Sequence, residues 1–276
     1  LLMIDCGEGA QLEMRRMRLK FSRLNHIFIS HLHGDHFFGL PGLLSTLSLL
    51  GKTGTLTIHT FADGKRLLQE WIDYFSRERT FNLEYNVIGT SSATIYEDDG
   101  ISVRTFPLRH RVPCVGFRID EKPKLRHMRP EAIMQYEIPH YAIQDLREGK
   151  DFVKPNGDII PNNVLTTDAD PCRSYAYCCD TTPSKRVVKV IEGVDWMYHD
   201  ATYGDDCARQ ARNRYHSTAR EAAIAAREAG AQNVILGHFS SRYIDESELL
   251  AQAREEFPAT IVANEQMRID LNHDIL

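Results

Sequence analysis

The chain has 276 residues, 42% of them hydrophobic, and a formal net charge of −5. This length can bury a large core, as one domain or as two fused halves. The negative balance argues against a globally basic nucleic-acid binder, although a local basic patch remains compatible with it. We expect neither a signal peptide nor a membrane span, because no apolar run approaches about 18 residues. The six cysteines form no C-x-x-C pair, and we interpret them as reduced thiols of a cytoplasmic protein.

Strands and helices alternate along the chain, as their hydrophobic periodicity indicates. The expected strands are residues 1–5, 26–29, 55–61, 81–87, 93–96, 101–107, 114–119, 175–179, 196–199, 234–237, 260–263 and 267–271. The expected helices are residues 11–20, 38–50, 63–75, 183–192, 219–229 and 246–257. Thr182 stands where it would cap the helix at 183–192, and Thr218-x-x-Glu221 predicts a capping box for the helix at 219–229. This alternation predicts an α/β protein built from two halves.

The alternation breaks between residues 121 and 170, a segment rich in charge, proline and asparagine. Helical stretches are expected at residues 130–136 and 141–148, with a hairpin-like turn at residues 155–158. The segment lacks a core-forming period of its own. We therefore interpret it as an insertion that projects from the main body.

The densest chemical signal is the string His31-x-His33-x-Asp35-His36, which directly follows the expected strand at residues 26–29. Alternate side chains of an extended segment share a face, so His31 and His33 can bind one cation. Gly34 then turns Asp35 and His36 toward a second position. This pattern predicts a two-metal hydrolytic site, in which metals about 3.5–4 Å apart activate a shared water.

Other expected strands also end in a metal-binding side chain: His110, Asp180 and His238. Each of these residues alone is weak support for a metal site, because a single strand-end histidine is more often a surface residue. Together with His31-x-His33-x-Asp35-His36 they complete two sets of metal ligands. We assign His31, His33 and His110 to one metal, and Asp35, His36 and His238 to the other, with Asp180 bridging through its two oxygens.

The order of these ligands resembles that of the metallo-β-lactamase superfamily. Several strings are similar to the bacterial ribonuclease Z family in particular: Ile4-Asp5-Cys6-Gly7-Glu8-Gly9-Ala10-Gln11, His216-Ser217-Thr218 and Gly237-His238-Phe239-Ser240-Ser241-Arg242-Tyr243. The resemblance covers nearly the whole chain. It implies a four-layered αββα sandwich with an inserted flexible arm, two zinc ions, a homodimer, and removal of the 3′ trailer from precursor tRNA. The family begins with a further strand and a Gly-rich turn, so we expect that an amino-terminal strand is missing from residues 1–276.

The resemblance also implies roles for particular residues. The family's arm, which grips the tRNA, corresponds to residues 123–165, although its usual Gly-Pro signature is absent. His216 is the candidate proton donor, and Asp200 stands where the family usually has glutamate, so we predict an Asp200–His216 pair. Asp35 is the expected base that orients and deprotonates the attacking water. Sites of histidine and aspartate also accept manganese or iron.

Candidate tRNA-binding cations are scattered rather than concentrated in one motif. They are Arg15, Arg16, Arg18, Arg147, Lys150 and Arg242, each of which could equally be ordinary surface. Two alternatives to tRNA processing remain open. One is a hydrolase of small phosphodiesters or other esters on the same metal site, and the other is a non-catalytic RNA-binding protein, which the complete ligand set disfavours.

Overall fold

The computed structural model describes residues 1–76 and 78–271, which divide into two compact units. Unit 1 comprises Leu1–Tyr96, Val103–Ile119 and the described part of Ser174–Leu276. Unit 2 comprises Glu97–Ser102 and Asp120–Arg173. The six cysteines are free thiols, as predicted. None of the helices in these residues has the length and apolar character needed to span a membrane.

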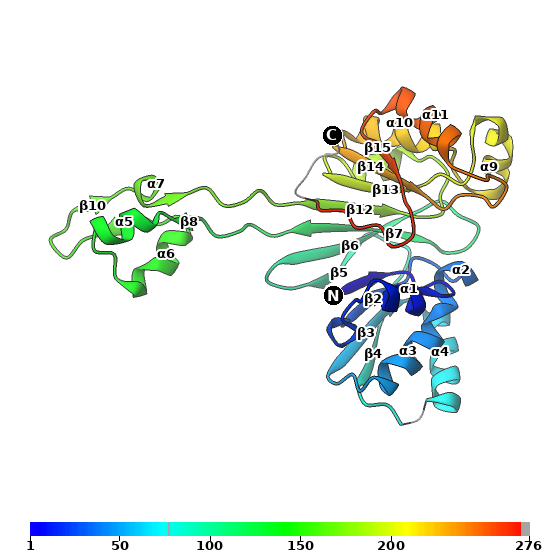
Figure 1. Cartoon of the computed structure of the whole chain (residues 1–276), viewed down its shortest axis with the longest axis horizontal. Coiled ribbons are helices and arrows are strands. Elements are labelled where there is room, and N and C mark those ends of the chain that lie inside the picture. The colour runs from blue at the N-terminus through cyan, green and yellow to red at the C-terminus, as the bar shows by residue number, and fades with distance from the viewer. Residues whose placement is uncertain (77, 272–276) are drawn as a thin grey trace. The chain divides into compact units, whose positions relative to one another are not determined.

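The first half of unit 1 is a parallel four-stranded sheet covered by helices (Figure 1). Its strands follow the chain order: β1 (Leu2–Ile4), β2 (His26–Phe28), β3 (Thr55–Thr60) and β4 (Asn82–Val87). The helices are α1 (Ala10–Arg16), α2 (Gly34–Phe37), α3 (Gly39–Leu49) and α4 (Ala62–Phe75), with a 3₁₀ turn at Phe21–Arg23. Leu40, Leu43 and Leu47 of α3 are fully buried in the core beneath this sheet, because leucines at this spacing share one helix face.

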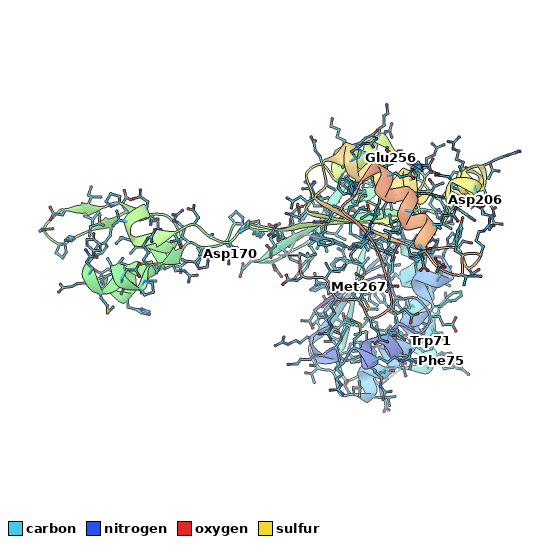
Figure 2. All side chains as sticks on the ribbon, turned by 45° about the horizontal axis from the view of Figure 1, so that its top comes forward. Trp71, Phe75, Asp170, Asp206, Glu256 and Met267 are labelled. Carbon is cyan, nitrogen blue, oxygen red and sulfur yellow. The ribbon has the colours of Figure 1, made fainter. Side chains whose placement is uncertain are left out.

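The second half of unit 1 is built on a seven-stranded sheet in the order β15-β14-β13-β12-β7-β6-β5. The strands are β5 (Ala93–Glu97), β6 (Ile101–Pro107), β7 (Val115–Glu121), β12 (Ser174–Cys178), β13 (Trp196–Asp200), β14 (Asn233–Gly237) and β15 (Thr260–Val262). The helices are α8 (Lys185–Val190), α9 (Ala208–Arg214), α10 (Ala219–Ala229) and α11 (Ser247–Glu256), with a 3₁₀ turn at Asp205–Cys207. Small alanine side chains let α10 pack closely in this core. Arg220 and Arg227 of α10 pair with Glu256 of α11, which is labelled in Figure 2.

The two sheets face each other between the two groups of helices. Phe28 of β2 and Phe117 of β7 meet there with ring centroids 5.7 Å apart. The hydroxyl of Tyr177 in β12 donates a hydrogen bond of 3.0 Å to Asp5, which follows β1. The expected αββα layering is therefore confirmed for unit 1. Because neighbouring strands are parallel in the four-stranded sheet and across β12–β15, the loops at the carboxyl ends of these strands gather at one edge.

Unit 2 has a small core of its own, contrary to our expectation. Its elements are β8 (His127–Met128), α5 (Pro130–Gln135), a 3₁₀ turn at His140–Ala142, α6 (Ile143–Arg147), β9 (Phe152–Val153), β10 (Ile159–Ile160), α7 (Asn162–Leu165) and β11 (Thr166–Thr167). Leu146, Phe152 and Leu165 are buried together. The Asn162 amide donates 2.7 Å hydrogen bonds to the carbonyl oxygens of Leu146 and Lys150. These apolar residues come from several short elements, so no single period reveals them. That residues 123–165 act as a tRNA-binding arm stays a prediction.

Several expected boundaries are wrong for local reasons. The helix expected at 183–192 begins only at Lys185, and its N-cap is Ser184 rather than Thr182, whose backbone N–H donates to the Arg109 carbonyl oxygen. The helix expected at 11–20 ends at Arg16, two residues before the left-handed Arg18. Residues 267–271 form no strand in the described structure. The predicted capping box of α10 is confirmed, with both Thr218–Glu221 hydrogen bonds present.

Candidate metal centre

The seven predicted ligands converge at the edge where these strands end. His31 and His33 follow β2, and α2 carries Asp35 and His36. His110 follows β6, Asp180 follows β12 and His238 follows β14. The ligand atoms form two clusters, in each of which all atoms lie within 4.8 Å of one another: His31, His33, His110 and Asp180, and then Asp35, His36 and His238. These are the two groups that the sequence pattern predicts.

Asp180 lies between the two clusters. Its Oδ2 is 3.5 Å from Nε2 of both His31 and His110 in the first cluster. Its Oδ1 is 3.3 Å from Nε2 of both His36 and His238 in the second. One carboxylate therefore contacts both groups through different oxygens, the geometry required of a bridging ligand.

The donor set fits a pair of divalent cations. His33 Nδ1 lies 3.1 Å from His31 Nε2 and 3.2 Å from His110 Nε2, so three ring nitrogens face one point. In the second cluster, His36 Nε2 and Asp180 Oδ1 are buried without a hydrogen-bond partner among the described residues. Buried polar atoms rarely stay unpaired, and a coordinated ion is one explanation. Burial lowers the pKa of His33, and lowers that of His110 to about 4, so both rings favour the neutral form that binds metal.

Carboxylates dominate the charge of the second cluster. The hydrogen bond from His238 and the neighbouring His36 imidazole, 3.4 Å away, hold the pKa of Asp35 well below its ordinary value, so this carboxylate is ionised near neutral pH. Burial alone would raise the pKa of Asp180, but the adjacent imidazoles of His31 and His36 outweigh burial and lower it. The site therefore presents two anionic carboxylates to a cation.

A second set of contacts orients the ligands, and sequence reasoning missed it. Asp5, which is 8% exposed, accepts a 2.7 Å hydrogen bond from His36 Nδ1, which leaves His36 Nε2 to face the cluster. His110 Nδ1 donates to the carbonyl oxygen of Tyr215 at 3.1 Å. His238 Nδ1 donates to Thr202 Oγ1 at 2.8 Å. Asp5 lies in the family-like string at residues 4–11, and no local pattern marks it as a partner of a metal ligand.

The predicted contact between Asp200 and His216 is present. Asp200 Oδ2 accepts from His216 Nδ1 at 2.8 Å, and Asp200 is completely buried. Thr202 Oγ1 donates to the other oxygen of Asp200 at 2.6 Å. The His216 ring stacks on His238, with centroids 5.1 Å apart. His216 is thus fixed at the edge of the second cluster, with Nδ1 engaged and Nε2 left for another partner.

The predicted substrate-binding cations lie in different settings. The Arg242 guanidinium lies 5.3 Å from the ring centroid of Tyr203, whose ring also contacts His216. Its neighbour Tyr243 donates to Asp206, a residue labelled in Figure 2. In unit 2, Arg147 Nε donates to a backbone carbonyl oxygen, and Lys150 pairs with Asp145 and Glu148. Arg16 of α1 pairs with Glu13.

The stacked sheets and the His/Asp clusters define a protein of the metallo-β-lactamase fold. A solved structure of the metallo-β-lactamase fold protein YhfI from Bacillus subtilis superposes with a TM-score of 0.62 at 15% identity, covering 95% of this chain and 84% of that one. A family model described as Anti-Pycsar protein Apyc1 matches residues 1–125.

Similar curated proteins show which family within the metallo-β-lactamase fold the chain belongs to. Ribonuclease Z of Bacteroides fragilis is 46% identical over 98% of this chain and 90% of its own length, and ribonuclease Z of Porphyromonas gingivalis is 47% identical with the same coverage. The crystal structure of human tRNase Z, short form, has a TM-score of 0.67 at 25% identity, covering 97% of this chain and 87% of that one. The chain belongs to the ribonuclease Z family, which confirms the resemblance seen in the sequence.

Proposed function

We propose that this chain is a metal-dependent endoribonuclease that removes the 3′ trailer from precursor tRNA, leaving a 3′-hydroxyl on the tRNA and a 5′-phosphate on the trailer. The observation that carries the proposal is the 46% identity to a ribonuclease Z across 98% of the chain. The two clusters of ligand atoms at one sheet edge support it independently. A protein with the same fold but an unrelated activity would not need to share the ribonuclease Z sequence along its whole length.

We further propose zinc as the metal, with two ions per chain held by His31, His33, His110, Asp180, Asp35, His36 and His238. Imidazole and carboxylate ligands suit zinc, and they also accept manganese and iron. When bound, such a pair would supply a water activated near neutral pH and would offset negative charge on the phosphate.

Asp35 and His216 handle the protons in this proposal. The Asp35 side chain is 62% exposed and its lowered pKa keeps it ionised, so the carboxylate is open to an attacking water, which it would orient and from which it would take a proton. As the water oxygen bonds to phosphorus, the bond to the 3′ oxygen of the tRNA breaks. His216 would donate a proton from Nε2 to that oxygen, while buried Asp200 holds Nδ1 and stabilises the imidazolium.

Recognition of the tRNA is proposed to depend on phosphate contacts from Arg242, Arg147 and Lys150, and on the arm at residues 123–165. Structured RNA is recognised largely by shape and backbone charge, so scattered cations are sufficient. We also propose a homodimer, on the family resemblance, and a cytoplasmic location, which the free cysteines support.

The test is incubation of the purified protein with a precursor tRNA that carries a 3′ trailer, beside a small chromogenic phosphodiester, each with and without chelator. Cleavage at the end of the tRNA body, abolished by chelator and restored by zinc, is the expected result. Activity on the small ester alone would instead support a hydrolase of small phosphodiesters. A matched Asp180→Asn variant identifies contaminating nuclease, because it should lose both activities.

A further inference from the structure

A cavity of about 580 Å³ adjoins the metal centre within unit 1. Arg109 and Tyr215, which line it, directly precede His110 and His216 in the chain. The Tyr215 carbonyl oxygen also accepts the hydrogen bond from His110 Nδ1. A second cavity of about 550 Å³ shares Arg109 with the first. Each falls within the range of small-ligand pockets, about 300–1,000 Å³.

These cavities carry uncompensated positive charge. Arg109, Lys185 and Arg186 line them, and across residues 1–76 and 78–271 their side chains make no ion pair or hydrogen bond. By contrast, Arg220 on the neighbouring helix α10 pairs with Asp205 and two glutamates. The one acidic residue lining the first cavity, Glu221, accepts the capping-box hydrogen bond of α10 and lies 3.9 Å from Arg212 of the same lining, so it leaves Arg109 unpaired. Such a cavity favours an anion, and a nucleic-acid phosphate is the anion that this site handles.

Two further features of the first cavity point to a ligand. Tyr215 caps α9 in the left-handed conformation, with φ +63°, where a non-glycine residue is usually asparagine and carries a strain of roughly 1–2 kcal/mol. Tyr215 is 37% exposed, and an exposed aromatic ring is a stacking platform for a base. Thr182 is 8% exposed, and its Oγ1 has no partner in the part of the chain that is described. A ligand in the cavity would satisfy this hydroxyl.

We propose that this cavity binds the last nucleotide of the tRNA body, with its base on the Tyr215 ring and its 5′ phosphate at Arg109. The inference rests on the proposed function. His216 must reach the leaving 3′ oxygen, so the nucleotide that bears this oxygen lies on the His216 side of the scissile phosphate. Tyr215 is the residue next to His216, and the first trailer nucleotide leaves on the other side.

A double-mutant cycle between protein and substrate tests the assignment. Precursor tRNAs carry an abasic site either at the last nucleotide of the tRNA body or at the first nucleotide of the trailer, and kcat/KM is measured with the zinc-loaded protein. Stacking on an aromatic ring is worth about 1–3 kcal/mol per base, so the first abasic site should lower wild-type kcat/KM by about tenfold or more. Asparagine tolerates the left-handed backbone at position 215 and keeps the backbone carbonyl. With Tyr215→Asn, kcat/KM for the intact substrate should therefore already be lowered by about tenfold or more, and the abasic site at the last nucleotide of the tRNA body should lower it no further. Tyr215→Phe should behave like wild type.

Other outcomes overturn the assignment. The assignment is refuted if the abasic site at the last tRNA nucleotide lowers kcat/KM as much in Tyr215→Asn as in wild type, or if it has no effect in wild type. If Tyr215→Asn instead removes the effect of the abasic site at the first trailer nucleotide, the trailer occupies the cavity. Failure of wild type to cleave intact precursor would refute the proposed function, and this inference with it. Arg66→Ala, an exposed cation on α4 paired with Glu70, is the matched surface control.

A second measurement covers the case in which Tyr215→Asn does not fold. Trailer-free tRNA ending in 4-thiouridine is irradiated in complex with the wild-type holoprotein, and crosslinked peptides are identified by mass spectrometry. The peptide that contains Tyr215 should dominate. Crosslinks confined to peptides without any residue of the cavity would refute the inference, and tRNA with 4-thiouridine only in the anticodon loop controls for nonspecific contact.

Discussion

Replacement of Asp5 by asparagine should weaken metal binding although Asp5 is no ligand. The Asp5 carboxylate accepts from His36 Nδ1, Ser30 N and Ser30 Oγ, each at 2.7 Å, and from the Tyr177 hydroxyl at 3.0 Å. Of these, only the Ser30 N–H bonds Oδ1, while the other three donors converge on Oδ2. Whichever way the asparagine amide turns, its NH₂ group faces donors and leaves hydrogen bonds unmade.

The size of the effect follows from these contacts. Each hydrogen bond to a charged group is worth about 1.5–3 kcal/mol, so we expect the free energy of unfolding of the metal-free protein to fall by roughly 3 kcal/mol. Loss of the partner that orients a metal-binding histidine typically costs about 10- to 100-fold in metal affinity. Zinc affinity should therefore fall by about 1.4–2.7 kcal/mol in Asp5→Asn.

The assay is competitive titration of zinc against a chromophoric chelator, with urea unfolding of the metal-free protein measured in parallel. Asp195→Asn is the matched control: Asp195 is also buried and accepts 2.7 Å hydrogen bonds from Ser174 N and Oγ, at the opposite end of β12 from Asp180. It should lose stability while keeping zinc affinity. Unchanged zinc affinity in Asp5→Asn, or an equal loss in both variants, would refute the reasoning.

Four further outcomes are expected. His216→Ala should lower turnover by about 10²- to 10⁴-fold with zinc content unchanged by elemental analysis, and a parallel loss of zinc would make His216 a structural or metal residue instead. Burial, reinforced by the charge of His26, lowers the pKa of His59 to about 4, so the unfolded chain binds more protons between pH 6.5 and 4. Urea unfolding should therefore show that the free energy of unfolding decreases as the pH is lowered through that window, by up to about 1.4 kcal/mol per pH unit. The same dependence of stability on pH in His59→Gln would contradict this. Thr218→Ala removes the cap of α10 and should cost about 1 kcal/mol in the same assay, whereas no loss would mean that the capping box contributes nothing. Affinity for tRNA should fall steeply with added salt, and a flat response would exclude phosphate contacts by cations such as Arg242.

The sequence predicted most elements of unit 1 because their patterns are local. Leu40, Leu43 and Leu47 mark the buried face of α3 by spacing alone, and each strand that ends in a ligand has an apolar run before it. The convergence of His31, Asp180 and His238 was predictable because each follows a strand with parallel neighbours, and parallel strands bring their carboxyl ends to one edge.

The remainder depends on contacts between distant segments. Asp5 and Tyr177 meet across the two sheets, and neither position has a local signature for that contact. The core of unit 2 combines Leu146, Phe152 and Leu165 from separate short elements, so no period of 2 or 3.6 residues exposes it. Helix α9 was missed because Ala211 is its only buried residue, which leaves no amphipathic pattern to detect.

Anomalous diffraction at the zinc edge, from crystals of the zinc-reconstituted protein, tests the central claim most directly. We predict two peaks per chain, one among His31, His33 and His110 and one among Asp35, His36 and His238, with Asp180 contacting both. Absence of a peak at these side chains after reconstitution would contradict the metal-dependent mechanism. A single peak would contradict the bridging role of Asp180.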